Sequence, residues 1–139
     1  MWQRVQTLYF FLSAALLAVA MCSTVALDVQ AGESLEFAQR VPYAVLGALG
    51  LAANLVALFS FKRRHLQIRL AGFGAVVLLG LQVWLAVDFF SFKEYVFRWV
   101  AILPLVCVYF DIMAIRGIFA DELLVKSSSR LRSAKNKKK

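Results

Sequence analysis

The chain has 139 residues, a formal net charge of +8 at pH 7, and 62 % apolar against 17 % charged residues. A soluble domain averages about 45–50 % apolar and about 25 % charged residues, so the composition excludes an ordinary soluble fold, and the length leaves room for one domain. The apolar residues stand in long runs without an alternating polar face, which is typical of a protein that crosses a lipid bilayer.

Four apolar runs are each long enough for a membrane-spanning helix, which needs about 20 residues. Strands are a poor alternative, because membrane strands alternate polar and apolar residues, whereas a helix satisfies every backbone group within its own segment. The fold class that we expect is an all-α membrane protein, a four-helix antiparallel bundle. Its helices are predicted at about residues 5–27, 41–61, 70–90 and 97–119.

The first run has a second interpretation. Arg4 before an apolar stretch, with small residues at positions 18–20, is also the pattern of a cleaved signal peptide. The apolar stretch continues well past that point, so we expect it to remain as the first helix. Cys22 and Cys107 both fall inside predicted helices without metal-ligand spacing around them, and we interpret them as small packing residues.

The distribution of Lys and Arg predicts the orientation, because cytoplasmic flanks of membrane helices carry an excess of both. Of the 16 basic residues, all but Arg40, Lys93 and Arg98 flank the start of the first helix, the connection between the second and third helices, or the C-terminal end. Both termini are therefore expected in the cytoplasm, in a bacterial inner membrane. Residues 1–120 form the predicted transmembrane domain, and residues 121–139 a cytoplasmic tail.

Small residues along the runs predict close helix packing, as is usual in membranes. Pro104 is expected to kink the fourth helix, because proline removes a backbone donor. The small residues recur every four positions in the first two helices and lie eight apart in the third: Ala14, Ala18, Cys22 and Ala26, then Ala44, Ala48 and Ala52, then Gly72 and Gly80.

Asp111 is the most unusual residue inside an apolar run. An aspartate at the centre of a membrane helix costs about 2.5–3.5 kcal/mol on insertion scales. No residue three or four positions away can pair with it, so its partner is another helix, water or its own proton. Tyr9 and Arg69 are the expected partners. Distances along the helices place a predicted polar cluster in the inner half of the membrane: Gln6, Tyr9, Asn54 and Asp111, with Gln82 in the outer half.

This predicted cluster has two interpretations. One is a site that handles protons or cations, and the other is a hydrogen-bonded structural contact. Transporters usually show internal repeats, matched broken helices or several ionisable groups along a path, so the structural interpretation is favoured. No catalytic, cofactor-binding or metal-ligating arrangement is recognisable, which favours a protein that is not an enzyme.

The tail is basic and ends in KNKKK. Attraction to anionic headgroups, about 1 kcal/mol for each basic residue near the membrane, is the simplest role for it, and contact with RNA or another acidic partner is the alternative. Residues 121–132, DELLVKSSSRLR, are expected to continue the fourth helix along or out of the inner interface, with one apolar and one charged side. His65 is interpreted as a solvated loop residue.

Three segments together resemble a family of small four-helix inner-membrane proteins of Bacteroidota, known as a domain of unknown function. They are WQRVQTLYFFL at 2–12, HLQIRL at 65–70 and DELLVKSSSRLR at 121–132. Ser129 departs from the family pattern, in which an acidic residue is expected before the last basic pair. The resemblance implies a signature at the cytoplasmic end: Gln3, Arg4, Gln6, Arg69, Asp121, Glu122, Arg130 and Arg132.

We therefore expect a membrane protein without enzymatic activity that works through its cytoplasmic face, as an accessory or docking module of a larger membrane complex or as a homo-oligomer. The alternative is a small transporter or channel component that uses Asp111. The predicted interaction surface consists of Gln3, Arg4, Arg64, Arg69, Asp121, Glu122, Arg130 and Arg132.

Overall fold

The computed structural model describes residues 2–60, 62–93 and 95–137, with side chains from Val5 onward. Within these residues the chain is mostly helical, as predicted. The α-helices are α1 (Trp2–Met21), α2 (Val41–Phe59), α3 (Arg64–Ser91) and α4 (Leu103–Lys137).

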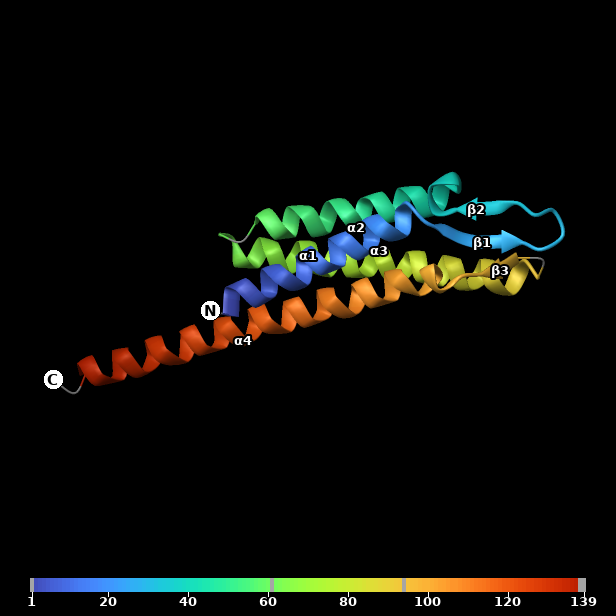
Figure 1. Ribbon diagram of the computed structural model, residues 1–139. Coiled ribbons are helices and arrows are strands. Elements are labelled where there is room, and N and C mark those ends of the chain that lie inside the picture. The colour runs from blue at the N-terminus through green and yellow to red at the C-terminus, as the bar shows by residue number, and fades with distance from the viewer. Residues whose placement is uncertain (1, 61, 94, 138–139) are drawn as a thin grey trace.

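The four helices form an elongated antiparallel bundle in which α1 and α3 each pack against α2 and α4 (Figure 1). The start of α1, the connection between α2 and α3, and the end of α4 lie at one end of the bundle, which we call the turn end (Figure 1). A small β-sheet lies at the opposite end, the sheet end. The last part of α4 projects beyond the other helices at the turn end.

The expectation of an all-α chain is wrong at the sheet end. There, in the described part of the chain, three antiparallel strands form a sheet in the order β2-β1-β3. Ala26 pairs with Phe97, and Leu27 pairs with Ser34. Two short 3-10 helices join the sheet to the bundle. The bounds are β1 (Thr24–Asp28), β2 (Ser34–Glu36), η1 (Phe37–Gln39), β3 (Tyr95–Phe97) and η2 (Trp99–Ile102).

The first helix therefore ends at Met21 rather than near residue 27. Thr24 and Val25 are β-branched residues, which favour strands over helices, and the Val25 carbonyl accepts a hydrogen bond from the Arg98 backbone N–H at 2.8 Å. The side chain of Val25 is fully buried. An apolar run does not distinguish a buried strand from the last turns of a helix, so only the long-range pairing with β3 decides the helix end.

A tight turn joins β1 to β2. Asp28 Oδ1 accepts hydrogen bonds from the backbone N–H groups of Gln30 (2.8 Å) and Ala31 (3.1 Å). Gly32 follows with a φ of +67°, a left-handed conformation that glycine adopts without steric cost. The hairpin thus satisfies its own backbone groups at the tip of the molecule.

The fourth helix also differs from the prediction. Because α4 begins at Leu103, Pro104 lies in its first turn, where a missing N–H is tolerated. The expected kink therefore has no basis. The helix then continues to Lys137 without interruption, so residues 121–137 extend it out of the bundle.

Close packing between α2 and α3 depends on Gly50 and Gly74, and not on the two glycines expected in the third helix. A Cβ on Gly50 would lie 2.7 Å from Leu78 Cδ2, and one on Gly74 would lie 3.2 Å from Ala53 Cβ. Gly72 and Gly80 have open space around them, and Ala48 and Ala52 are exposed. The spacing of small residues correctly indicates that helices approach closely, but not which face they use.

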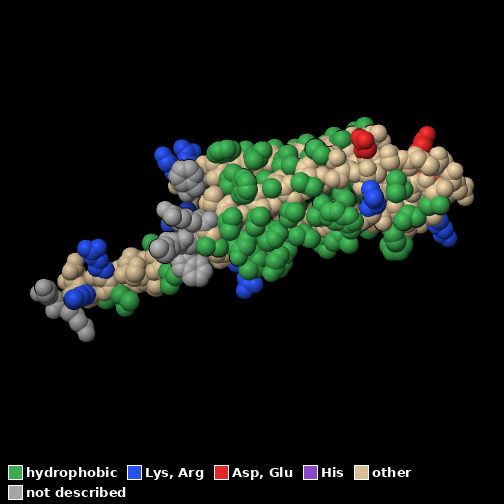
Figure 2. Space-filling view, viewed as in Figure 1, with side chains coloured by type: hydrophobic (Ala, Val, Ile, Leu, Met, Phe, Trp, Pro, Cys, Tyr) green, Lys and Arg blue, Asp and Glu red, His purple; other side chains and the backbone are tan. Residues whose placement is uncertain are grey.

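The outer surface of the bundle is largely apolar. In the part of the chain that the structure describes, three segments are long and apolar enough to cross a membrane: Val41–Phe59, Arg64–Ser91 and Trp99–Lys137. The apolar part of α1, Val5–Met21, is shorter. Figure 2 shows hydrophobic side chains over the middle of one face, basic ones gathered toward the turn end and along the projecting part of α4, and acidic ones near the sheet end.

Candidate functional site

A polar cluster joins three helices in the interior of the bundle. With the Asn54 amide oriented to satisfy both of its ends, Nδ2 lies 3.2 and 3.3 Å from the two carboxyl oxygens of Asp111, and Oδ1 accepts a hydrogen bond from Ser13 Oγ at 2.8 Å. Cys107 Sγ donates to the Ser13 backbone carbonyl at 3.3 Å. We call Ser13 (α1), Asn54 (α2), Cys107 and Asp111 (α4) the interior polar cluster.

The interior polar cluster is closed on all sides. All four residues have no exposed surface. Along α1, Ser13 separates Phe10 from Leu17, and these two belong to separate apolar clusters, one toward the turn end and one toward the sheet end. Buried polar groups are costly unless hydrogen-bonded. The hydrogen bonds of the interior polar cluster hold α1, α2 and α4 in one register. The role that this arrangement can have is therefore structural.

The structure brings two members of the predicted cluster together, Asn54 and Asp111, and places the other two elsewhere. Gln6 is buried beside Gly117 of α4, and its Nε2 has no hydrogen-bond partner among the described residues. The Tyr9 ring stacks on Phe110 at a centroid distance of 6.1 Å. Neither of the partners expected for Asp111, Tyr9 or Arg69, is its hydrogen-bond partner.

The predicted cluster lacked two members: Cys107, which was interpreted as a small packing residue, and Ser13. A single serine in an apolar run is unremarkable, because it can bond to its own helix backbone. The position of Ser13 could have revealed it. The residues that form the buried face of α1 recur every three or four positions: Gln6, Phe10, Ser13 and Leu17.

A second buried carboxyl group lies at the sheet end. Asp88, near the end of α3, accepts a hydrogen bond from the Tyr43 hydroxyl, and its Oδ2 lies 3.5 Å from Arg40 Nη1. The Arg40 guanidinium also lies over the Phe92 ring, 4.9 Å from its centroid. These contacts fasten the start of α2 to the end of α3. Asp88 was not among the residues singled out from the sequence, although Arg40, expected at the same end of the bundle, was the available signal.

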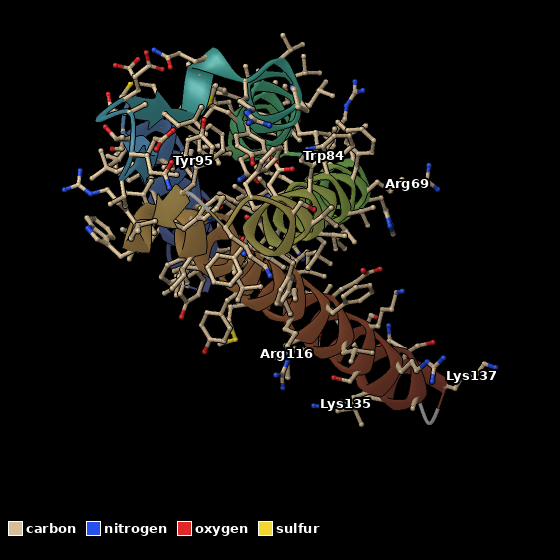
Figure 3. All side chains as sticks on the ribbon, turned by 90° about the vertical axis from the view of Figure 1, so that its right-hand side faces the viewer. Arg69, Trp84, Tyr95, Arg116, Lys135 and Lys137 are labelled. Atoms are coloured by element: carbon tan, nitrogen blue, oxygen red, sulfur yellow. The ribbon has the colours of Figure 1, made fainter. Side chains whose placement is uncertain are left out.

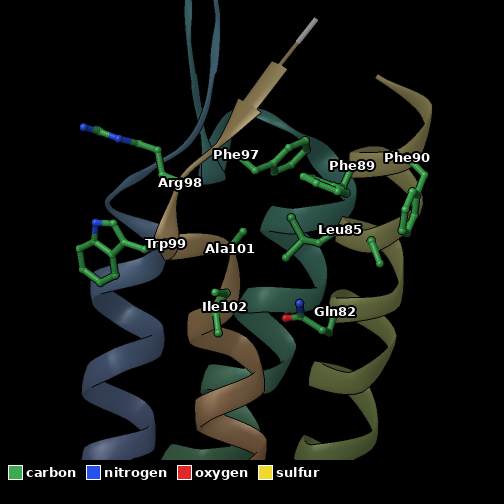
Figure 4. A pocket seen from close by; sticks show the side chains of 10 residues that line it. Gln82, Leu85, Phe89, Phe90, Phe97, Arg98, Trp99, Ala101 and Ile102 are labelled. Carbon is green, nitrogen blue, oxygen red and sulfur yellow. The ribbon is translucent and has the colours of Figure 1, made fainter. Parts of the chain in front are cut away.

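A cavity of about 340 Å³ opens between α3 and η2 at the sheet end. Figure 4 shows aromatic side chains around it, among them Phe89 and Phe97, with Gln82 at its inner end. The Gln82 Oε1 atom is buried and accepts no hydrogen bond within the described ranges. The rest of the cavity lining is largely apolar, and Arg98 is its one charged residue.

The turn end carries a pocket of different character, between the start of α3 and α4. Its volume is about 390 Å³, and its apolar lining consists of Ile68, Phe119 and Leu123. The polar lining consists of His65, Arg69, Glu122 and Lys126, and we call all seven residues the turn-end pocket.

One ion-pair network organises the turn-end pocket. Lys126 Nζ lies 2.8 Å from Glu122 Oε1, and His65 Nε2 lies 3.9 Å from the same oxygen. His65 is thus a residue of α3 rather than a loop residue, and it contacts α4. Arg69 has no side-chain partner recorded among the described residues and faces the pocket as an exposed cation.

Residues 121–137 of α4 form a projection that we call the α4 extension, and its first turns also line the turn-end pocket. Leu123, Leu124 and Leu131 are each more than 60 % exposed on it. The serines at 127, 128 and 129 each donate a hydrogen bond to the carbonyl three residues earlier, at 2.9 Å. Serine is a weak helix former, so the serines do not by themselves account for the helix in this segment.

The remaining residues of the predicted interaction surface lie on this side of the molecule. Arg64 is half-buried at the start of α3, Asp121 is half-buried where the α4 extension begins, and Arg130 and Arg132 are exposed along it. The side chains of Gln3 and Arg4 lie outside the described residues. The surface therefore divides into a pocket between two helices and a single exposed helix.

Comparison with known proteins identifies a family for the chain. Residues 2–131 match a family described as a domain of unknown function, DUF4293. Neither the curated proteins nor the solved structures contain a match to the chain.

Proposed function

The chain belongs to the DUF4293 family, and we propose that it is an integral inner-membrane protein that docks a partner through its cytoplasmic face. The observation that carries the docking part is the α4 extension, an exposed helix with leucines and basic residues beyond the bundle. The three segments that resemble inner-membrane proteins of Bacteroidota support the placement in a bacterial inner membrane.

The membrane part of the proposal rests on the outward-facing side chains. Large apolar residues are exposed along the bundle, for example Phe59, Phe73 and Val76, and an apolar surface of this extent is unfavourable in water. We infer four spans: the three long apolar helices and α1, which packs against α4 and α2. The excess of Lys and Arg at the turn end supports a cytoplasmic location for that end and for both termini.

Cysteine labelling tests this orientation. In a Cys22→Ser background, where Cys107 is fully buried, we expect a membrane-impermeant maleimide to label Ala31→Cys in intact spheroplasts. The matched position, Ser133→Cys on the α4 extension, should become labelled only after the membrane is permeabilised. Labelling of position 133 in intact spheroplasts would contradict the proposed orientation.

The composition of the α4 extension favours a helix that is covered by a partner over one that stays exposed to water. Leu124 and Leu131 are seven residues apart and therefore share one helix face. At about 1.5 Å per residue, the part of the extension after Lys126 reaches roughly 16 Å beyond the turn-end pocket. A projecting helix with serines in its middle gains most of its stability from packing against something else. A partner that covers the leucines would supply that packing.

The charges favour an acidic partner over a second copy of the chain. Asp121 and Glu122 stand at the start of the α4 extension, whereas the rest is basic: Lys126, Arg130, Arg132, Lys135 and Lys137. Two parallel copies would bring like charges together, which costs several kcal/mol when they are closely juxtaposed. An amphipathic helix or groove with acidic flanks has complementary chemistry; RNA, which also attracts basic segments, offers no apolar surface for the leucines.

A pull-down from native membranes in mild detergent tests the docking proposal. We expect Arg130→Ala/Arg132→Ala to reduce the co-purified partner about tenfold, since charge-assisted contacts contribute roughly 1–3 kcal/mol together. Lys93→Ala/Arg98→Ala removes the same charge at the sheet end and should have no effect. Equal recovery of a partner with both variants, or a partner released by ribonuclease, would contradict the proposal.

The alternative function, a small transporter or channel component, would use Asp111. Its carboxyl group is fully buried and bonded to Asn54, which supports the structural role more than a transport path. We accordingly expect the Asp111→Asn variant to co-purify with the partner as wild type does, because asparagine keeps a polar group beside the Asn54 amide.

A further inference from the structure

We propose that the turn-end pocket binds the phosphate of one anionic phospholipid from the cytoplasmic leaflet. This inference rests on the proposed orientation but not on a docked partner. It concerns a defined site, as distinct from general attraction of a basic tail to the membrane.

The position of the turn-end pocket supports a lipid ligand. Arg69 directly precedes the apolar part of α3, and Phe119 ends the apolar part of α4. The pocket between them therefore lies at the level where lipid phosphates lie when these helices span the membrane. Basic pockets between helices on the cytoplasmic side are suited to phospholipid headgroups.

The turn-end pocket also has an excess of positive charge. Glu122 is the one carboxylate among the seven lining residues, and it is already bonded to Lys126 and in contact with His65. Arg69 is left as a cation without an acidic partner in the lining. A guanidinium presents several donors in a planar arrangement that matches phosphate oxygens, so Arg69 and Lys126 together form an anion site in which Glu122 positions the lysine.

The start of α3 adds to the positive electrostatic potential of the pocket. Helix N-termini carry unpaired backbone N–H groups and a partial positive charge, and Arg63, the N-cap residue of α3, makes no side-chain capping hydrogen bond. His65 lies in this first turn and lines the pocket. An anion in the pocket is thus favoured by the backbone as well as by the side chains.

The apolar lining selects a lipid over a free anion. Ile68, Phe119 and Leu123 line the pocket, and Phe119 and Leu123 are at least half exposed. A soluble phosphate would leave these side chains uncovered, whereas the glycerol and upper acyl carbons of a phospholipid would cover them and gain burial energy. A volume of about 390 Å³ lies within the usual range for small-molecule sites.

Native mass spectrometry of the purified protein with phosphatidylglycerol and phosphatidylethanolamine in equal amounts tests this site. We expect wild type to retain one phosphatidylglycerol molecule, and Arg69→Gln/Lys126→Gln to lower that retention about 30-fold, as two lost cations imply. Both side chains are exposed, so the variant should fold. Arg69→Lys, which keeps the charge but loses the planar donor arrangement, should recover part of the binding.

The control removes the same charge farther along α4. Lys135→Gln/Lys137→Gln changes two exposed lysines that do not line the pocket, and Figure 3 shows both on the α4 extension, apart from Arg69. This variant should retain lipid within about twofold of wild type. Equal losses in both double variants, or no preference for phosphatidylglycerol in wild type, would overturn the proposal. Displacement of the lipid by millimolar inorganic phosphate would likewise overturn it in favour of a free-anion site.

Discussion

Replacing Asn54 by leucine is expected to lower the free energy of unfolding by about 3 kcal/mol, because it leaves the buried Asp111 carboxyl group without its amide donor. Leucine has the same number and branching of side-chain heavy atoms as asparagine, so the change removes the hydrogen bonds while keeping the shape of the side chain. Ser13 loses its acceptor on Asn54 at the same time. The measurement is the free energy of reversible unfolding in mixed micelles or bicelles.

A double-mutant cycle separates this effect from a simple packing defect. In Asn54→Leu/Asp111→Leu no carboxyl group remains to be satisfied, so the double variant should be more stable than Asn54→Leu alone. Ser60→Ala, a half-buried polar residue just after α2, serves as a control and should change stability by less than about 0.5 kcal/mol. An Asn54→Leu protein as stable as the control would show that the interior polar cluster does not hold the helices together.

The second large effect is expected on docking. Leu124→Ser/Leu131→Ser should weaken partner binding about 100-fold, since two leucines that become buried contribute roughly 1.5 kcal/mol or more each. Val125→Ser lies about 100° around the helix from Leu124 and removes a similarly exposed apolar side chain, so it is the matched control. Binding is measured with the purified partner in nanodiscs.

Unchanged binding of the Leu124→Ser/Leu131→Ser variant would mean that the leucines are not the docking face. Equal losses in this variant and in Val125→Ser would indicate a loss of helix rather than of contacts, and circular dichroism of the two variants distinguishes these causes. The expected result is an unchanged helix content with a loss of binding confined to the leucine variant.

Much of the helical architecture follows from the sequence, because run length and flanking charge are local properties. The second helix, Val41–Phe59, lies within two residues of its predicted bounds. The first helix was overextended, because residues 24–28 are as apolar as a helix but pair with Tyr95–Phe97, about 70 residues away. Such pairing depends on the three-dimensional approach of two connections, which the local pattern does not contain.

The candidate sites were predictable to different degrees. Counting residues from the basic flanks placed Asn54 and Asp111 at similar depth, and they are in contact in the structure. The same counting grouped Tyr9 with them, although its ring packs on Phe110. Depth along a helix is readable from sequence, whereas the direction in which a side chain points depends on how the helices are rotated against one another. His65 and Glu122 line one pocket because of how α3 and α4 are rotated against each other. Their contact was therefore not predictable from the sequence.

Site-specific photo-crosslinking in living cells tests the central claim, docking through the α4 extension, most directly. A photoreactive phenylalanine analogue replaces Leu131 in one strain and Val29 in another; both positions are at least 70 % exposed but lie at opposite ends of the molecule. The account predicts one discrete protein adduct at position 131 that is absent at position 29. No adduct at 131, or the same set of adducts at both positions, would contradict it.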